Sequence, residues 1–361
     1  MTTGANDIKT LALDASNEAV NIAYRLGNRI HQHRVRRAQK NQLEPVIVPT
    51  SGYGTTNWVR ILGRALYKTD LFENTFKILN PEDPNSSDPV RGWRSFTSIA
   101  IPNAPITITI AGVSHQVRAD QGGVIDVKLE QSLPPGSHPV TLSTPGSQPA
   151  QTSVYIISPD QNVGIICDID DTIMHTALPR PFVAAWNSFV LNEHARSATP
   201  GMNILLHRLK EAHPQAPIIY LSTGAWNITP TLRRFLHRHG YPKGTYLLTD
   251  WGPTPDRWFR SGTQHKIQAL KRLAEELPHI QWILIGDDGQ GDPEIYQGFA
   301  QRYPANTQAI LIRNLTLGET LLSSGRLWPE TNPKNTPAHP RLIEGHDGPT
   351  LYQKLTTKGL L

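Results

Sequence analysis

The feature that most constrains the fold is a regular alternation of two hydrophobic patterns in the second half of the chain. Short apolar runs with the length of a buried strand alternate with segments of helical period. The strand candidates are 163–167, 217–222, 245–249, 281–286 and 308–313, and the helix candidates are 200–213, 229–239, 263–277 and 292–302. Runs without polar interruption are typical of strands covered on both faces. We therefore predict an α/β domain over 161–325, with a Rossmann-like, doubly wound parallel sheet.

A different pattern precedes this domain. Between about 45 and 160 the hydrophobic period is two, as in Ile106-Thr-Ile108-Thr-Ile110, and turn-forming Pro and Gly residues separate the short apolar segments. Several short strands at this spacing predict a small β-sandwich domain over 45–160.

The two ends of the sequence have patterns of their own. Residues 8–40, within the predicted N-terminal segment 1–44, have apolar positions at helical spacing and predict one amphipathic helix. Its C-terminal part is basic, which favours a helix packed on its own protein, with cations near the negative end of the helix dipole. An interfacial membrane helix is the alternative. Residues 326–361 are Pro-rich and are predicted to form an irregular C-terminal tail.

Charge and cysteine content narrow the class of protein. The net charge of +5 suits anionic partners such as phosphoesters, nucleic acid or acidic lipid headgroups, without choosing among them. The single cysteine, Cys167, excludes an internal disulfide framework and fits a reducing compartment. The first residues show no secretory signal, and no stretch reaches the roughly 20 apolar residues of a membrane span. We expect a cytoplasmic protein.

The polar residues that end each apolar run are the candidate site residues, because ligands of an open parallel sheet bind beyond the carboxyl ends of its strands. The first run ends in Asp168-Ile-Asp170-Asp-Thr172. Asp168 and Asp170 are two residues apart, so an extended backbone directs both to the same side. Two such carboxylates repel each other and raise each other's pKa. A hard divalent cation such as Mg²⁺ removes that conflict.

Three further signals follow in order along the chain. The second run ends in Ser222-Thr223-Gly224, whose hydroxyl and backbone N–H groups suit a phosphate oxygen. Lys266 lies near the start of a predicted helix, where the helix dipole disfavours a cation, and a residue that breaks a local rule is a functional candidate. The fourth run ends in Gly286-Asp287-Asp288 and is followed by Asp292. Each signal is weak alone, but their order is hard to reach by accident.

Together these residues resemble the motifs of the haloacid-dehalogenase superfamily, namely DxDxT, a strand-end Ser or Thr, a Lys, and GDxxxxD. The resemblance implies that Asp168 is the nucleophile and Asp170 the general acid and base. It implies that Ser222 and Lys266 bind the phosphoryl group and that Thr172 braces the first loop. Mg²⁺ would be held by the set Asp168, Asp170, Asp287 and Asp292, with Asp170 contributing its backbone carbonyl and Asp292 orienting Lys266 or the metal's waters.

The chemistry implied by the resemblance is phosphomonoester hydrolysis through an aspartyl-phosphate. A carboxylate attacks phosphorus while a divalent cation and Lys266 neutralise the phosphoryl oxygens. Asp170 then serves first as acid and later as base. An Asp two residues after the nucleophile favours phosphatases over ATPases within this superfamily.

A narrower resemblance covers roughly residues 45–325. The segments Ser51-Gly-Tyr-Gly-Thr55, Tyr220-Leu-Ser-Thr-Gly-Ala-Trp226-Asn227, Leu248-Thr-Asp-Trp-Gly252 and Arg257-Trp-Phe-Arg260 are similar to the bacterial branch of the actin-patch-associated phosphatidate phosphatase family. This similarity implies hydrolysis of phosphatidate to diacylglycerol, a reaction of lipid metabolism, and a peripheral contact with the membrane. No nucleic-acid partner is expected.

The segment around Trp258 bears on the substrate. Arg257 and Arg260 are close in sequence to Lys266, so we predict that they contact phosphate or a lipid headgroup. The other predicted substrate-binding residues are Thr172, Thr223 and Gly224. Two alternatives stay open. A phosphatase of soluble phosphomonoesters would share every catalytic residue, whereas a non-catalytic membrane- or protein-binding module would need a broken motif, and no motif is broken.

Overall fold

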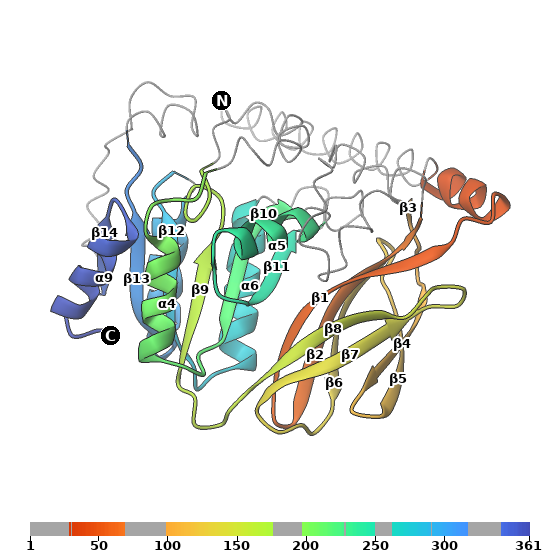
Figure 1. Cartoon of the computed structure of the whole chain (residues 1–361), viewed down its shortest axis with the longest axis horizontal. Helices are drawn as coiled ribbons and strands as arrows, with labels where there is room; N and C mark the ends of the chain where they lie inside the picture. Colours follow the sequence, from red (N-terminus) through yellow and green to blue (C-terminus); the bar gives the residue numbers. More distant parts are fainter. Residues whose placement is uncertain are drawn as a thin grey trace, which may run out of the picture.

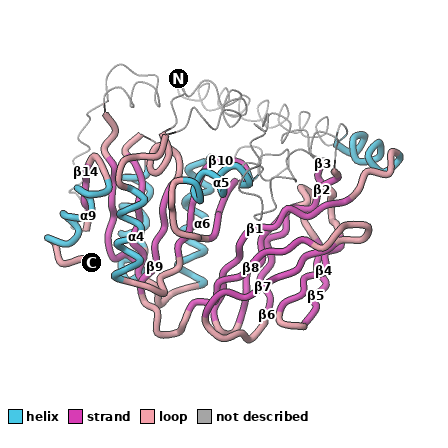
Figure 2. Tube along the Cα trace, in the orientation of Figure 1, coloured by secondary structure: helices cyan, strands magenta, loops and turns pink. Residues whose placement is uncertain are grey.

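The computed structural model describes residues 29, 31–68, 99–175, 197–226, 229–249, 262–289, 291–316 and 341–361, and the statements below concern these residues. They form an α/β protein with two sheets, which lie side by side in Figure 1. Figure 2 shows that helices lie alongside the second sheet, whereas the first consists of strands joined by loops.

The C-terminal sheet is parallel and has six strands in the order β11-β10-β9-β12-β13-β14. The strands are β9 (Val163–Asp168), β10 (Ile218–Ala225), β11 (Thr245–Thr249), β12 (Gln281–Asp287), β13 (Thr307–Arg313) and β14 (Leu342–Gly345). The first five confirm the predicted strands to within three residues at either end. The strand order reverses between β9 and β12, which is the position where ligands bind in open parallel sheets.

Helices cover both faces of this sheet. On one face α4 (Met202–Ala212), α5 (Thr229–Arg238) and α9 (Gly348–Thr357) pack on Ile165 and Cys167 of β9. On the other face α6 (Gly262–Glu276) and α7 (Asp292–Arg302) pack on Ile166, and the short 3-10 helix η5 (Pro304–Asn306) leads into β13. Successive residues of β9 therefore enter opposite cores, which explains why the run carries no exposed polar residue before Asp168.

The predicted β-sandwich is instead one curled mixed sheet of eight strands in the order β3-β2-β1-β8-β7-β4-β5, with β6 also paired to β2. Its strands are β1 (Pro45–Thr55), β2 (Trp58–Tyr67), β3 (Ile99–Ala100), β4 (Pro105–Ile110), β5 (Val113–Arg118), β6 (Val124–Glu130), β7 (Gly136–Ser143) and β8 (Ala150–Ile157). One half of this sheet contains β1, β2, β3 and β6, and the other contains β4, β5, β7 and β8. The parallel pairing of β1 with β8 joins the two halves, which would be separate sheets in a sandwich. A register shift between Thr50 and Tyr53 bends β1.

A group of polar side chains connects the curled sheet to α6 of the parallel one. Arg60 of β2 is paired with Glu276 at the end of α6, and Tyr53 Oη donates a 2.8 Å hydrogen bond to the same carboxylate. Asp126 of β6 accepts from Arg60 at 2.5 Å and from Arg272 of α6 at 2.6 Å. We call these five residues the α6 clamp, because they attach this helix to the curled sheet.

The ends of the chain differ in how far they match expectation. Residues 31–40 are helical, in line with the predicted N-terminal helix, whereas 1–28 and residue 30 lie outside the described residues. The C-terminal prediction was wrong for 341–361, which form β14 and α9 instead of an irregular tail. Asp347 accepts from the Thr350 N–H at 2.9 Å and thereby starts α9. Among the described helices, none is long and apolar enough to cross a membrane.

Candidate active site

The loop after β9 brings its acidic residues back over the end of the sheet. Asp171 adopts a left-handed backbone conformation with φ of 58°, which turns the chain sharply after Asp170. Arg313, at the end of β13, is 3% exposed and donates a 2.7 Å hydrogen bond to the Asp171 carbonyl. The turn is therefore held from a strand that is two places away in the sheet.

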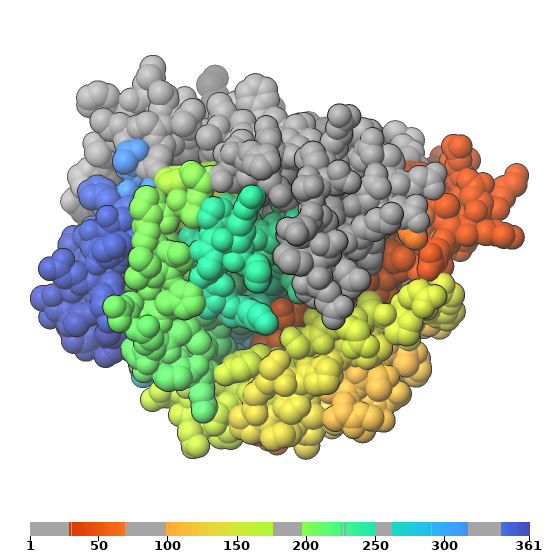
Figure 3. Space-filling model, viewed as in Figure 1, coloured from red at the N-terminus to blue at the C-terminus, as the bar shows by residue number. Residues whose placement is uncertain are grey.

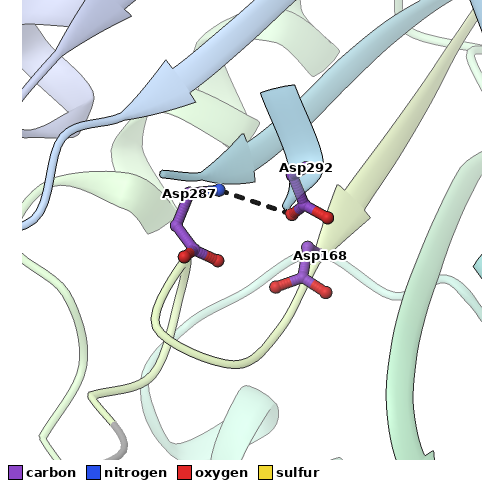
Figure 4. Close-up of side chains that lie close together, drawn as sticks. All are labelled: Asp168, Asp287 and Asp292. Atoms are coloured by element: carbon purple, nitrogen blue, oxygen red, sulfur yellow. Dashed lines mark hydrogen bonds between the residues drawn. The ribbon is translucent and has the colours of Figure 1, made fainter. Parts of the chain in front are cut away.

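Three carboxylates meet where the strand order reverses. Asp168 ends β9, Asp287 ends β12 and Asp292 begins α7, and one oxygen from each lies within 4.8 Å of the others. All three side chains are fully buried, and Figure 4 shows them gathered around one space. The grouping is a candidate metal centre, because three oxygen ligands at such short separations suit a hard cation.

Lys266 supplies the positive charge of this cluster. Its Nζ lies 2.7 Å from Asp168 Oδ1 and donates a 2.6 Å hydrogen bond to Asp292 Oδ1. The contact with Asp168 is an ion pair without good hydrogen-bond direction, so that oxygen is buried without a donor aimed at it. One ammonium group therefore faces three carboxylates, and all the ion pairs those carboxylates make within the described residues come from it.

The surroundings shift the pKa values of these groups. Burial raises the pKa of Asp168 well above its ordinary value, and the nearby Asp292 carboxylate adds to the rise although Lys266 opposes it. Burial followed by Asp292 and Asp168 raises the pKa of Asp287 in the same way. Burial alone would lower the pKa of Lys266, but the two partner carboxylates outweigh it and raise that pKa. The cluster thus carries excess negative charge that an added cation would relieve.

Thr172 and Gly286 set the spacing of the carboxylates. The Thr172 hydroxyl lies 3.2 Å from Asp168 Oδ2 and 3.3 Å from Asp287 Oδ2, so it connects the ends of β9 and β12. A Cβ atom on Gly286 would lie 2.3 Å from Asp292 Oδ2, and only glycine leaves Asp292 this close to the strand. Asp292 Oδ2 in turn accepts from the Asp287 N–H at 3.4 Å.

The end of β10 contributes a second polar group beside Asp170. Ser222 Oγ donates a 2.8 Å hydrogen bond to Asp170 Oδ2 and accepts one of the same length from the Gly224 N–H. Thr223 and Gly224 follow in the same bulged end of β10, and their carbonyls both accept from Thr249 Oγ1 at the end of β11. The Ser222 hydroxyl and the Asp170 carboxyl group are therefore in direct contact.

Trp226 directly follows β10 and packs against the curled sheet. Arg64 of β2 is buried, and its guanidinium lies 4.2 Å from the centre of the Trp226 ring. Its Nε donates a 2.8 Å hydrogen bond to the Gly122 carbonyl. The end of β10, which carries Ser222, is therefore supported from outside the parallel sheet.

The structure brings together most of the residues selected from the sequence. All but one of them lie at the carboxyl ends of β9, β10 and β12 or on the segments that follow: Asp168, Asp170, Thr172, Ser222, Thr223, Gly224, Asp287 and Asp292. Lys266 joins them from α6, which follows β11. Arg257 and Arg260 lie outside the described residues. Arg313 was missed, although it ends an apolar run just as Asp168 and Asp287 do, and that position was the available signal.

The site matches the sequence model of a known family. Residues 163–314 match the family described as phosphatidate phosphatase APP1, catalytic domain. The chain is 24% identical over 234 residues to phosphatidate phosphatase APP1 of Saccharomyces cerevisiae, covering 61% of this chain and 39% of that protein. It is also 25% identical over 161 residues to an uncharacterised protein of Schizosaccharomyces pombe, covering 43% and 26% of the two chains. The chain thus spans well under half the length of these curated relatives.

Solved structures are less informative than these sequence relatives. A carbohydrate acetylesterase from Xanthomonas citri aligns with 76% of this chain and 52% of its own, at 12% identity and a TM-score of 0.23. A superposition of this quality carries no argument about fold or function.

Proposed function

Because residues 163–314 belong to the phosphatidate phosphatase APP1 catalytic-domain family, we propose that the chain is a Mg²⁺-dependent phosphatase that hydrolyses phosphatidate to diacylglycerol. The observation that carries the proposal is the buried contact of Asp168 with Lys266, beside Asp287 and Asp292. The proposed fold class is the haloacid-dehalogenase type of doubly wound sheet. The strand order and the placing of the acidic residues at its reversal support it.

Asp168 is the proposed nucleophile. One of its carboxylate oxygens forms a bond to phosphorus, and the bond between phosphorus and the lipid oxygen breaks. Lys266 is placed to neutralise charge on the transferring group, because its Nζ already lies 2.7 Å from the attacking carboxylate. Asp292 holds that ammonium group in position through a 2.6 Å hydrogen bond.

Asp170 is the proposed acid and base. It gives a proton to the departing diacylglycerol oxygen, and it later takes a proton from the water that attacks the aspartyl-phosphate. That second step releases inorganic phosphate and restores the Asp168 carboxylate. Ser222, which donates to Asp170 at 2.8 Å, holds the acid in place and offers its hydroxyl to a phosphoryl oxygen. Thr223 and Gly224 are proposed to bind the same oxygens.

The donor set fits a hard divalent cation. Asp168, Asp287 and Asp292 would hold it together with the Asp170 backbone carbonyl, and Mg²⁺ is the proposed occupant. When bound, the cation supplies positive charge that offsets the phosphoryl oxygens and the surplus carboxylates.

Phosphate release separates the lipid substrate from soluble ones. The purified chain would be given Mg²⁺ and either phosphatidate in mixed micelles or a panel of sugar and nucleotide monophosphates. We expect higher kcat/KM on phosphatidate, and dependence of the rate on its surface fraction in the micelle rather than on bulk concentration alone. A preference for the soluble compounds would leave the phosphatase chemistry standing and remove the lipid substrate.

Arg257 and Arg260 are proposed to contact the headgroup, on the strength of their sequence alone. Replacing either with Ala should reduce kcat/KM on phosphatidate more than on a small chromogenic phosphate. Equal losses on the two substrates would remove these residues from headgroup recognition. A cytoplasmic location with peripheral membrane contact completes the proposal.

A further inference from the structure

The N-terminal helix carries a stripe of basic residues on one side. Arg29 and residues 31–40 are helical, and the spacing of the basic positions places them within roughly a third of the helix circumference. We call this set the basic stripe, and it consists of Arg29, His33, Arg36, Arg37 and Lys40. All five are exposed, and no Asp or Glu occurs between residues 29 and 40.

The opposite side of the helix fixes its orientation. Val35 and Ala38 are buried against Tyr67 of β2, in a cluster that Leu43, Ile99 and Ile101 complete. Because the apolar side is already used in this packing, the basic stripe must face away from the curled sheet. Figure 3 shows this segment (red) projecting at the upper right edge of the molecule.

The helix that carries the stripe and the end of β10 both contact the same strand pair, β2 and β3. Tyr67 of β2 packs against this helix, whereas its neighbour Leu66 packs on the opposite face of the strand pair with Ala100 and Trp226. Trp226 follows directly after the carboxyl end of β10, where Ser222 lies. In Figure 1 the helix and the carboxyl ends of the parallel strands both lie toward the upper side.

We propose that the basic stripe docks the protein onto an anionic lipid bilayer. Clustered Lys and Arg on an amphipathic helix are attracted by the negative surface of acidic lipids. The apolar side chains of the helix are buried, so the attraction is electrostatic and does not require insertion into the hydrocarbon. The choice of a bilayer over other polyanions rests on the proposed function, since phosphatidate resides in membranes.

Vesicle sedimentation tests this docking without any substrate. The full chain would be mixed with vesicles of phosphatidylcholine alone, or of phosphatidylcholine with a minor fraction of phosphatidylserine. Phosphatidylserine is anionic but carries no phosphomonoester, so binding to it does not depend on the catalytic site. The test variant combines Arg36→Gln, Arg37→Gln and Lys40→Gln. The control combines Arg118→Gln, Arg208→Gln and Lys271→Gln, which removes the same charge from exposed positions on β5, α4 and α6.

The wild type and the control should sediment with vesicles that contain phosphatidylserine and should not bind vesicles of phosphatidylcholine alone. For the test variant we expect the partition coefficient to fall roughly a hundredfold, from about a fivefold loss per charge removed near the surface. Added salt should weaken wild-type binding, because it screens exposed charges. Circular dichroism would check that each variant is folded.

Three results would overturn the docking proposal. These are absence of wild-type binding to the anionic vesicles, an equal loss in the test and control variants, and preferential binding of the stripe to duplex RNA or DNA over vesicles. Because the assay contains no phosphatidate and measures no turnover, these results are independent of the proposed activity. Failure of phosphatidate hydrolysis would likewise leave the vesicle result intact.

Discussion

Lys266 and Asp292 join the N-terminal parts of two consecutive helices, with a 2.6 Å hydrogen bond from Lys266 Nζ to Asp292 Oδ1. A cation near the start of α6 is disfavoured by that helix dipole, whereas the carboxylate at the start of α7 is favoured by its own. The pair therefore places a positive charge where the local structure would not, next to the Asp168 carboxylate. The two carboxylates compensate for this unfavourable position and keep the ammonium group charged beside the proposed nucleophile.

Replacing Lys266 tests that role. Lys266→Met should lower kcat by about 10²- to 10³-fold, the usual loss when one charge-stabilising group is removed. The matched control is Lys271→Met on the same helix, where Lys271 is exposed and, within the described part of the chain, pairs with Glu275 alone. Steady-state phosphate release measures both variants. A Lys266→Met enzyme with wild-type turnover would exclude the ammonium group from the reaction.

Asp168→Asn tests the nucleophile. The amide is nearly the same size but cannot form the phosphoaspartate, so phosphate release should fall by at least about three orders of magnitude. Far-ultraviolet circular dichroism should stay close to that of the wild type. Acid-quenched enzyme should yield phosphorylated protein for the wild type and none for the variant. Phosphoprotein at equal yield in both would assign the nucleophile to another residue.

Metal removal tests the carboxylate cluster with a readout other than turnover. Mg²⁺ should raise the melting temperature of the chelator-treated protein, because it binds the folded state and relieves repulsion among the three buried carboxylates. Asp287→Asn should reduce this rise, whereas an exposed change such as Glu211→Gln should not. Ca²⁺ should restore little activity, since its longer bonds and looser coordination misplace the attacking oxygen. Full turnover after exhaustive chelation would contradict the metal dependence.

The α6 clamp should contribute to stability and, indirectly, to activity. Arg60→Met removes the guanidinium paired with the nearly buried Glu276 carboxylate and leaves it the hydrogen bond from Tyr53, so we expect a loss of about 3 kcal/mol in the free energy of unfolding. The double variant Arg60→Met with Glu276→Gln should recover part of this loss, because no charge is then left buried. Urea unfolding of the four combinations gives the coupling between the two residues. Additive losses would show that the pair is not coupled.

Acid should weaken the same clamp through Asp126. Burial would raise the pKa of this carboxyl, but Arg272 and Arg60 outweigh it and lower the pKa below its ordinary value. Its stabilising contribution is therefore complete above the unfolded-state pKa of about 4 and is lost as the pH falls through the lower folded-state value. Comparing the pH dependence of unfolding for the wild type and Asp126→Asn checks this, and parallel curves would contradict it.

The parallel sheet could be predicted from the sequence because its information is local. Uninterrupted apolar runs fix β9 and β12, and the acidic residues that follow them mark the site edge. The role of Arg313 could not be predicted, because its contact with the Asp171 carbonyl joins positions far apart in the chain. Nothing near Arg313 distinguishes a strand-end arginine that binds a turn from one that faces solvent.

Two parts of the fold depend on strand pairings that cannot be predicted from the local sequence. β14 is only four residues long, with the sequence Leu-Ile-Glu-Gly, and becomes a strand by pairing with β13. The start of α9 did carry a signal, since Asp347 precedes Gly348-Pro349 as an N-cap precedes a first turn. Whether the N-terminal strands form one sheet or two depended on the pairing of β1 with β8, which local periodicity cannot reveal.

That pairing shapes the order in which the protein can assemble. β1 and β8 are neighbours in the sheet, although β2 to β7 lie between them in the sequence, so a long stretch of chain must be gathered before they meet. Tyr53, on the paired part of β1, is also buried in the core beneath α6 and α7. Closure of the curled sheet and completion of that core are therefore linked events, and contacts between such distant segments slow folding. β1 can pair with β2 early, but its other edge stays unpaired until β8 has been synthesised. During that interval the nascent chain exposes a strand edge that a chaperone could recognise.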